Sequence, residues 1–316
     1  EVRFYAPDFT QGIVQNSGAE VTCPLTAHAA AGQTLVVEKL VCIRTSRDAD
    51  ERIAAAPGDW SFHALWGAHT VAWSHTWQNC DRTLPNEELQ IGLRYSMFQL
   101  MASCAAHDPT VSIGARGLTH ARYKGCYFWD TDLFMLPFFL KNDKTAAKNL
   151  CLYRANALDA ARDHAKKMNA AGARYPWMAA LGGSEQCETW DIGCSEVHIT
   201  ADVAYALGEY CRETGDEEFY LHKAAPVFIE TARFWASRYT WNRAHTQADL
   251  MFCKGPDEYC GITRNNLFTN VMVQHNLALA IDAAKALQGK SAYQNLGLSE
   301  EETASWQTLH DAILWP

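Results

Sequence analysis

Apolar residues recur at helical spacing through most of the chain after residue 86. Apolar positions three and four residues apart are typical of amphipathic helices, so this pattern predicts a mainly α-helical fold. The predicted helices span residues 87–106, 131–141, 144–169, 196–213, 217–239, 266–288 and 299–314. Pro137 falls within the second of them, so that helix either carries the proline in its interior or ends there.

One boundary between two helices is marked by its residue types. The run Thr214-Gly215-Asp216-Glu217-Glu218 combines a glycine typical of a helix C-terminus with the acidic first turn of a following helix. We therefore expect one helix to end and the next to begin here.

Residues 1–47 follow a different pattern. The segment 33–44 is rich in β-branched residues and is bounded by Gly32 and Ser46, which predicts a strand. Because one or two strands do not form a stable sheet alone, we interpret residues 1–47 as the trailing edge of a larger β-domain. The chain starts at Glu1 without a methionine and ends at Pro316 directly after a helical pattern, so we expect a piece of a longer protein.

Residues 48–86 are predicted to connect the β-segment to the helices. Residues 48–56 are helical in pattern, and tryptophans and histidines recur from Trp60 to Trp77 at spacings that place many of them on one helical face. Packing against a neighbouring domain is favoured over a metal or cofactor site. His69 and His75 are six residues apart and do not converge on one face of a helix.

Three long loops rich in Gly, Trp and Asp join the predicted helices, at residues 107–130, 170–195 and 240–265. An ordinary helix bundle has shorter loops, so helices and loops together predict an α/α toroid. The three loops fall at the same phase of the helix-pair repeat. We therefore expect them to cluster at one mouth, where functional residues concentrate.

Composition and charge narrow the class of partner. The chain has 316 residues, of which 48% are hydrophobic, and a net charge of −9, which describes a soluble globular protein. No strongly basic stretch is present, which argues against binding nucleic acid or an anionic membrane. No segment approaches the roughly 20 apolar residues of a membrane span.

The 11 cysteines show no Cys-x-x-Cys spacing. That argues against a zinc site, and we predict no metal ligands. Their odd number, with several inside helical patterns, favours free thiols in a reducing cytoplasm.

Two short segments hold carboxyl groups among aromatic residues, at 128–132 (Phe-Trp-Asp-Thr-Asp) and 255–259 (Gly-Pro-Asp-Glu-Tyr). A carboxyl beside a ring and a proline-fixed turn is one whose pKa can be raised, as a general acid requires near neutral pH. Rings that stack on a sugar, beside carboxylates that bind its hydroxyls, suit carbohydrate recognition. An isolated Asp-Glu pair is more often a solvated surface feature.

With these segments located, the chain resembles glycoside hydrolase family 65, the inverting phosphorylases and hydrolases of α-glucosidic disaccharides. The resemblance runs from about residue 33 to 290. It rests on residues 93–100, 115–119, 127–137, 175–177, 196–202, 231–238 and 255–259. It implies that residues 1–47 end an N-terminal β-sandwich, that 48–86 are a helical linker, and that 87–316 belong to a catalytic (α/α)6 barrel truncated at its C-terminus.

The resemblance implies that Glu258 is the general acid. The residues around it agree with that role, because Pro256 fixes the turn and the neighbouring charge of Asp257 disfavours a second negative charge. We expect Tyr259 to add partial desolvation.

The resemblance also implies that Trp129 and Asp130 hold the glucose of the donor sugar. Asp130 could also be the N-cap of the helix predicted over 131–141, and both roles could hold at once. Asp132, Trp177 and Asp257 are further candidates for binding substrate. His198 is either a substrate ligand or a core histidine held by Glu196 or Asp202.

The sequence departs from the family pattern in the mouth loops. Cys126 stands where the family usually has His, Met178 and Ala179 replace an acid and a Ser, and Cys260 stands where a His is common. These departures leave the fold prediction intact and put the acceptor sugar and the linkage in question.

The implied activity is phosphorolysis of an α-linked glucosyl disaccharide of the kojibiose, maltose, nigerose or trehalose type. Glu258 protonates the glycosidic oxygen and inorganic phosphate, a co-substrate, attacks to give β-glucose 1-phosphate. No cofactor is implied. A cytoplasmic homodimer is expected.

Two alternatives stay open. One is an inverting α-glucosidase that uses a downstream carboxylate base about 6.5–9.5 Å from the acid. The other is a carbohydrate-binding homologue without catalysis, which the departures at Cys126, Met178 and Cys260 would support.

Overall fold

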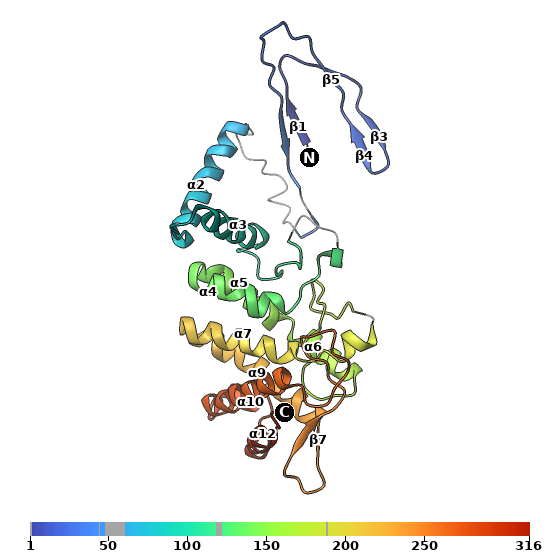
Figure 1. Ribbon diagram of the computed structural model, residues 1–316, viewed down its shortest axis with the longest axis vertical. Helices are drawn as coiled ribbons and strands as arrows, with labels where there is room; N and C mark the ends of the chain where they lie inside the picture. Colours follow the sequence, from blue (N-terminus) through green and yellow to red (C-terminus); the bar gives the residue numbers. More distant parts are fainter. Residues whose placement is uncertain (1, 44, 48–60, 118–121, 188) are drawn as a thin grey trace. The chain divides into compact units, whose positions relative to one another are not determined.

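The computed structural model describes residues 2–43, 45–47, 61–117, 122–187 and 189–316, and the chain divides into two compact units, Glu1–Arg82 and Thr83–Pro316 (Figure 1). The division falls inside the segment predicted as a linker. The helix predicted over 48–56 lies outside the described residues.

The first unit begins with one long β-hairpin made of three nested antiparallel pairs. The pairs are β1 (Val2–Tyr5) with β6 (Glu38–Val41), β2 (Thr10–Gln11) with β5 (Leu25–Thr26), and β3 (Gln15–Ser17) with β4 (Glu20–Thr22). The strand predicted over 33–44 is confirmed only for Glu38–Val41, because β1 offers a partner to those four residues alone. In the described part of the hairpin only Leu40 is buried, so the hairpin has no core of its own.

The helix α2 (Phe62–Cys80) follows in the same unit, and Ser61 caps its N-terminus by accepting from the backbone N of Ala64 at 3.2 Å. Its aromatic residues stack along one face as predicted. Successive ring centroids of Phe62, Trp66, His69, Trp73 and Trp77 lie 5.9–6.4 Å apart. His69 is thus a member of an aromatic row.

The second unit is mainly helical, which confirms the predicted class. Its helices are α3 (Glu87–Ser103), η1 (Arg122–Gly125), η2 (Thr131–Met135), α4 (Leu136–Asn142), α5 (Lys144–Asn156), α6 (Leu158–Lys167), η3 (Trp190–Cys194), α7 (Ile199–Thr214), α8 (Glu217–Phe219), η4 (Tyr220–Ala224), α9 (Ala225–Arg238), α10 (Leu267–Leu287), α11 (Ser291–Asn295) and α12 (Glu300–Ala312). A short hairpin, β7 (Tyr239–Trp241) and β8 (Ala248–Leu250), follows α9. In the described residues no helix is long and apolar enough to cross a membrane.

Two of the predicted helices contain a change of winding rather than a break. The π-helical turn η2 precedes Pro137, and the π-helical turn η4 precedes Pro226; each proline lies in the first turn of the α-helix that follows. Proline lacks an N–H, so it is tolerated in a first turn. The wider π turn lets the chain continue in one direction across each proline.

The predicted boundary at Gly215 is confirmed. Gly215 has φ of 66° at the C-terminus of α7, a left-handed conformation that favours glycine. Asp216 then caps α8 by accepting from the backbone N of Phe219 at 3.0 Å. The longer helix predicted over 144–169 is divided at Ala157 into α5 and α6.

The core of the second unit lies where α10 packs against α9 and α7, with α12 alongside (Figure 1). Trp235 of α9 is fully buried there and donates Nε1 to Asn276 Oδ1 of α10 at 2.9 Å. Buried indole and amide groups require such partners. This packing fixes the register of α9 against α10.

A buried ion pair ties the start of η2 to α5. The Asp132 carboxylate accepts from Arg154 Nη2 at 2.6 Å and from Nε at 3.1 Å, and the two side chains are 7% and 2% exposed. Burial raises the pKa of Asp132, and the Arg154 guanidinium opposes that shift. Asp132, predicted as a substrate ligand, therefore has a structural partner inside the protein.

Breaking this pair should be strongly destabilising. Arg154→Met leaves the Asp132 carboxylate buried without a cation, and we expect a loss of about 3–5 kcal/mol in the free energy of unfolding. Denaturant unfolding of the full-length protein measures it. The double variant Arg154→Met/Asp132→Leu should recover most of the loss because an apolar pair needs no charge compensation.

The control is Lys285→Met, which removes the Lys285–Asp282 pair whose side chains are 68% and 72% exposed. Its effect should stay below about 1 kcal/mol, as for other surface pairs. A loss in Arg154→Met no larger than in this control would contradict the assignment.

Candidate functional site

The three long loops of the second unit contact one another, as their phase predicted. Tyr127 and Ala179 exchange both backbone hydrogen bonds, at 3.0 and 2.8 Å, which joins the first loop to the second. The backbone N of Lys254 donates to Ser195 O at 3.0 Å, which joins the third loop to the second. Backbone hydrogen bonds thus link the described part of the second loop to the first loop and to the third.

The starts of three helices meet at an aromatic cluster formed by Trp129, His198 and Phe268. The His198 ring lies 4.9 Å from Trp129 and 5.5 Å from Phe268, both edge-on, and Trp129 lies 6.1 Å from Phe268. Trp129 comes just before η2, His198 just before α7, and Phe268 is in the first turn of α10. The predicted candidates Trp129 and His198 are thus in direct contact, and Phe268 joins them without having been predicted.

His198 is a buried histidine held by Asp202, which was one of the two alternatives. Its Nδ1 lies 2.6 Å from Asp202 Oδ2, and both side chains are 0% exposed. Burial raises the pKa of Asp202 to about 6, against the favourable hydrogen bond from His198. The other ring nitrogen, Nε2, is buried and makes no hydrogen bond.

Trp177 lies on a loop whose backbone is held by the carboxylate of Glu185. Glu185 accepts hydrogen bonds from the backbone N atoms of Trp177, Met178, Gln186 and Cys187, at 2.7–3.1 Å. The Trp177 ring packs edge-on against Phe128 at 4.9 Å, next to the Trp129–Asp130 pair. The sequence alone did not point to Glu185, since its partners are backbone groups that no residue type reveals.

Glu258 lies in an exposed turn closed by a short antiparallel bridge. Cys253 N donates to Thr263 O at 3.1 Å and Thr263 N donates to Cys253 O at 2.7 Å. Glu258 and Asp130 are both exposed in this structure. Tyr259 is fully exposed, so the expectation that it desolvates Glu258 is wrong: its side chain points into solvent and covers nothing.

Asp257 directs its carboxylate into its own turn. It accepts from Tyr259 N at 3.0 Å and from the Cys260 thiol at 3.2 Å, and these bonds lower its pKa. The thiol donor, Cys260, is the residue that stands where the resemblance leads us to expect a histidine. Asp257 therefore shapes the turn that carries Glu258.

Gly255 places this turn directly against the start of α10. A Cβ at Gly255 would lie 2.3 Å from Asn266 Nδ2 and 2.6 Å from Asn266 Cγ. Asn266 is the N-cap of α10, where its Oδ1 accepts from Thr269 N at 3.0 Å. The close approach requires glycine, and it is what brings the general-acid candidate to the helix starts.

Glu196 is the site residue that the sequence considered only as a possible partner of His198. It is 1% exposed, and its Oε1 makes no hydrogen bond. Burial, followed by the nearby charge of Glu258, raises its pKa to about 7, while His198 and Lys254 oppose the shift. The third loop thus brings Glu258 within electrostatic reach of Glu196.

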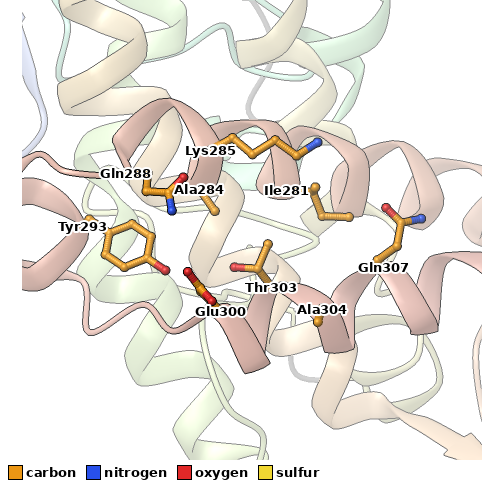
Figure 2. Close-up of a pocket in the computed structure, with 9 residues that line it drawn as sticks. All are labelled: Ile281, Ala284, Lys285, Gln288, Tyr293, Glu300, Thr303, Ala304 and Gln307. Atoms are coloured by element: carbon orange, nitrogen blue, oxygen red, sulfur yellow. The ribbon is translucent and has the colours of Figure 1, made fainter.

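A separate pocket of about 340 Å³ lies at the other end of α10 (Figure 2). Its lining includes Lys285, Tyr293 and Glu300, from α10, α11 and α12. Lys285 is 17 residues beyond Phe268 on α10, which places it roughly 26 Å away along the helix. None of the predicted site residues lines this pocket. Among the described residues, no group of three or more His, Cys, Asp or Glu could hold a metal ion.

Comparisons with known proteins show the family of the chain. The model of the glycosyl hydrolase family 65 central catalytic domain matches residues 94–316, and the chain belongs to this family. A kojibiose phosphorylase of Caldanaerobacter subterraneus subsp. tengcongensis is 36% identical over 310 residues, covering 90% of this chain and 40% of the relative. An α,α-trehalose phosphorylase of Thermoanaerobacter brockii is 33% identical over 320 residues, covering 96% and 41%.

A solved structure supports the fold. It is described as a candidate kojibiose phosphorylase from the human microbiome, and it matches with a TM-score of 0.82 at 23% identity, over 99% of this chain and 43% of that one. The chain spans about two fifths of the length of the relatives compared here.

The contact between Gly255 and Asn266 gives a direct test. Gly255→Ala must displace Asn266 from its cap, and we expect a loss of about 1 kcal/mol in stability from the cap. The turn carrying Glu258 should move as well, and activity should fall more than stability explains. Thermal unfolding and steady-state kinetics of the full-length protein measure both.

Gly261→Ala is the matched control, because a Cβ there meets nothing within 4 Å in the same turn. It should leave the free energy of unfolding close to that of wild type, as surface changes usually do. Activity should stay within about twofold of wild type. Equal effects of the two substitutions would show that the Asn266 contact is not the cause.

Proposed function

We propose that the full-length protein catalyses the inverting phosphorolysis of an α-linked glucosyl disaccharide of the kojibiose, nigerose, maltose or trehalose type. Membership of family 65, with the Gly-Pro-Asp-Glu-Tyr turn docked at the starts of α7 and α10, carries the proposal. The relatives named above are phosphorylases of kojibiose and trehalose, which favours phosphate over water as the nucleophile.

In this reaction the Glu258 carboxyl gives its proton to the glycosidic oxygen while the bond from that oxygen to C1 breaks. A phosphate oxygen forms the new bond to C1 from the opposite face. The products are β-glucose 1-phosphate and the released sugar. Phosphate is already an anionic nucleophile, so no base has to activate it. The position of Glu258 in an exposed turn lets solvent return the proton.

The aromatic cluster supports binding of the glucose unit. Trp129 supplies a half-buried indole face whose orientation is set by contact with His198 and Phe268. The exposed Asp130 carboxylate, beside Trp129, is free to accept hydrogen bonds from sugar hydroxyls. The fixed loop of Trp177 adds a second ring beside them.

We extend the proposal to the whole protein. The helices of the second unit contribute part of an (α/α)6 toroid, and the exposed apolar side chains of the β-hairpin belong to the end of a β-sandwich domain. The protein acts as a cytoplasmic homodimer and needs phosphate as co-substrate but no cofactor. Cys260, which binds Asp257, and Met178, which lies next to Trp177, are the positions from which we expect differences in acceptor sugar.

Removing the proposed acid tests the mechanism. Glu258→Gln keeps the size of the side chain and removes its proton, so kcat/KM for the disaccharide should fall about 10²–10⁴-fold. With α-glucosyl fluoride and phosphate the fall should be under about tenfold, because fluoride leaves with little need of a proton. Release of β-glucose 1-phosphate measures both.

Glu301→Gln, an exposed glutamate in the first turn of α12, is the control and should not change either rate. Wild-type turnover of the disaccharide that is unchanged without phosphate would reject phosphorolysis. Full activity of Glu258→Gln on the disaccharide would remove Glu258 from the role of acid.

A further inference from the structure

The carboxylate of Glu185 closes a turn in the second loop by binding backbone at both ends of the turn. Its Oε2 accepts from Trp177 N at 2.7 Å, and its Oε1 accepts from Met178 N at 3.0 Å. Oε1 also accepts from Gln186 N at 3.1 Å and from Cys187 N at 2.9 Å. Hydrogen bonds to an ionised carboxylate are roughly twice as strong as neutral ones. Glu185 thus holds the beginning of the turn against its end.

Glu185 also belongs to a row of backbone bridges that joins the first loop to the second. Gly114 pairs with Tyr127, Tyr127 pairs with Ala179, and Ala179 pairs with Glu185, each in the antiparallel sense. Trp129 follows Tyr127 by two residues in the same loop. The turn that Glu185 closes is therefore joined through backbone to the loop that carries the proposed glucose-binding residues.

The ring of Trp177 depends on this backbone for its position. Its Nε1 is buried and makes no hydrogen bond, so no polar contact of the side chain fixes the indole. Phe128, edge-on at 4.9 Å, and the edge of the core contact the ring. Apolar contacts are non-directional and do not set the orientation of a ring as a hydrogen bond does. The bond from Trp177 N to Glu185 is therefore the polar contact that holds this residue.

We propose that Glu185 is a positioning residue for the reaction: its bonds to the backbone of Trp177 and Met178 hold the Trp177 ring where it contacts the bound disaccharide. This inference rests on the proposed function, in which Trp177 lies beside the glucose unit. Glu185 itself does not touch substrate and acts through Trp177. Misplacing a group that positions substrate by about 1 Å can cost about 10²-fold in rate, so the hold on the turn matters to the reaction.

A double-mutant cycle of Glu185 and Trp177 in the full-length protein tests the inference. In Glu185→Gln one carboxylate oxygen becomes an amide NH2, which cannot accept from the backbone, so bonds at one end of the turn are lost. We expect kcat/KM for the disaccharide to fall about tenfold or more, mainly through KM, because a stacked ring binds substrate and transition state alike. Trp177→Ala should lower it at least as much. The double variant should lie within about twofold of Trp177→Ala, because both changes remove the same ring contact.

Asp191→Asn is the matched control, because it removes an exposed carboxylate from the same loop. It should leave kcat/KM within about twofold of wild type. Glu185→Asp is the second variant, for use if Glu185→Gln does not fold. Its shorter side chain still reaches the backbone N two residues on, as aspartates do in turns, but no longer reaches Trp177 and Met178. It should therefore repeat the loss and the dependence of that loss on Trp177.

A merely structural Glu185 would change only the fraction of folded protein. Its substitution would then lower kcat/KM by the same factor in the presence and in the absence of the Trp177 ring. That additive result would overturn the inference, and so would wild-type kcat/KM in a folded Glu185→Gln or Glu185→Asp variant.

The Kd of the disaccharide supplies a readout that does not depend on turnover. Measured by calorimetry in the Glu258→Gln background, it should rise about tenfold with Glu185→Gln or Trp177→Ala and no further when the two are combined. A Kd that Glu185→Gln leaves unchanged would contradict the inference. If wild type cleaves the disaccharide equally well without phosphate, phosphorolysis is rejected while both cycles keep their meaning, so the two failures are distinguishable.

Discussion

The structure depends on the packing of α10 against α7 and α9, because this packing places the starts of separate helices at one end. The start of α7 carries Glu196 and His198, and the start of α10 carries the cap that Gly255 touches. Helix packing is set by side chains along the whole length of each helix, so it is far stiffer than any loop. A few backbone hydrogen bonds hold the three long loops to these helices and so restrain the loops as well.

Three carboxyls are buried beside these helix starts, and their partners separate their roles. Asp132 has a cation, Arg154, which offsets the penalty of burial. Asp202 has a histidine, and its pKa is raised to about 6. Glu196 has an Oε1 without a hydrogen bond, and burial, followed by the charge of Glu258, raises its pKa to about 7.

Backbone anchors explain how an exposed turn holds Glu258, the proposed general acid, in place. The turn of Glu258 has little buried apolar surface, and its tip is exposed. Its position comes from the bridge between Cys253 and Thr263, from the Lys254–Ser195 bond and from the contact of Gly255 with Asn266. Anchors of this kind fix the ends of a turn and leave the reactive side chain open to substrate.

The sequence by itself determined the helical class, the boundary at Gly215 and the segments that carry Trp129, His198 and Glu258. Periodicity, caps and short motifs are local, and they survive in any arrangement of the helices. Only the tertiary structure decided that Asp132 is paired with Arg154, that Tyr259 shields nothing, and that Glu196 lies within reach of Glu258. Burial and electrostatic interactions depend on which segments meet in space. Local sequence patterns do not reveal contacts between residues that are far apart in the chain.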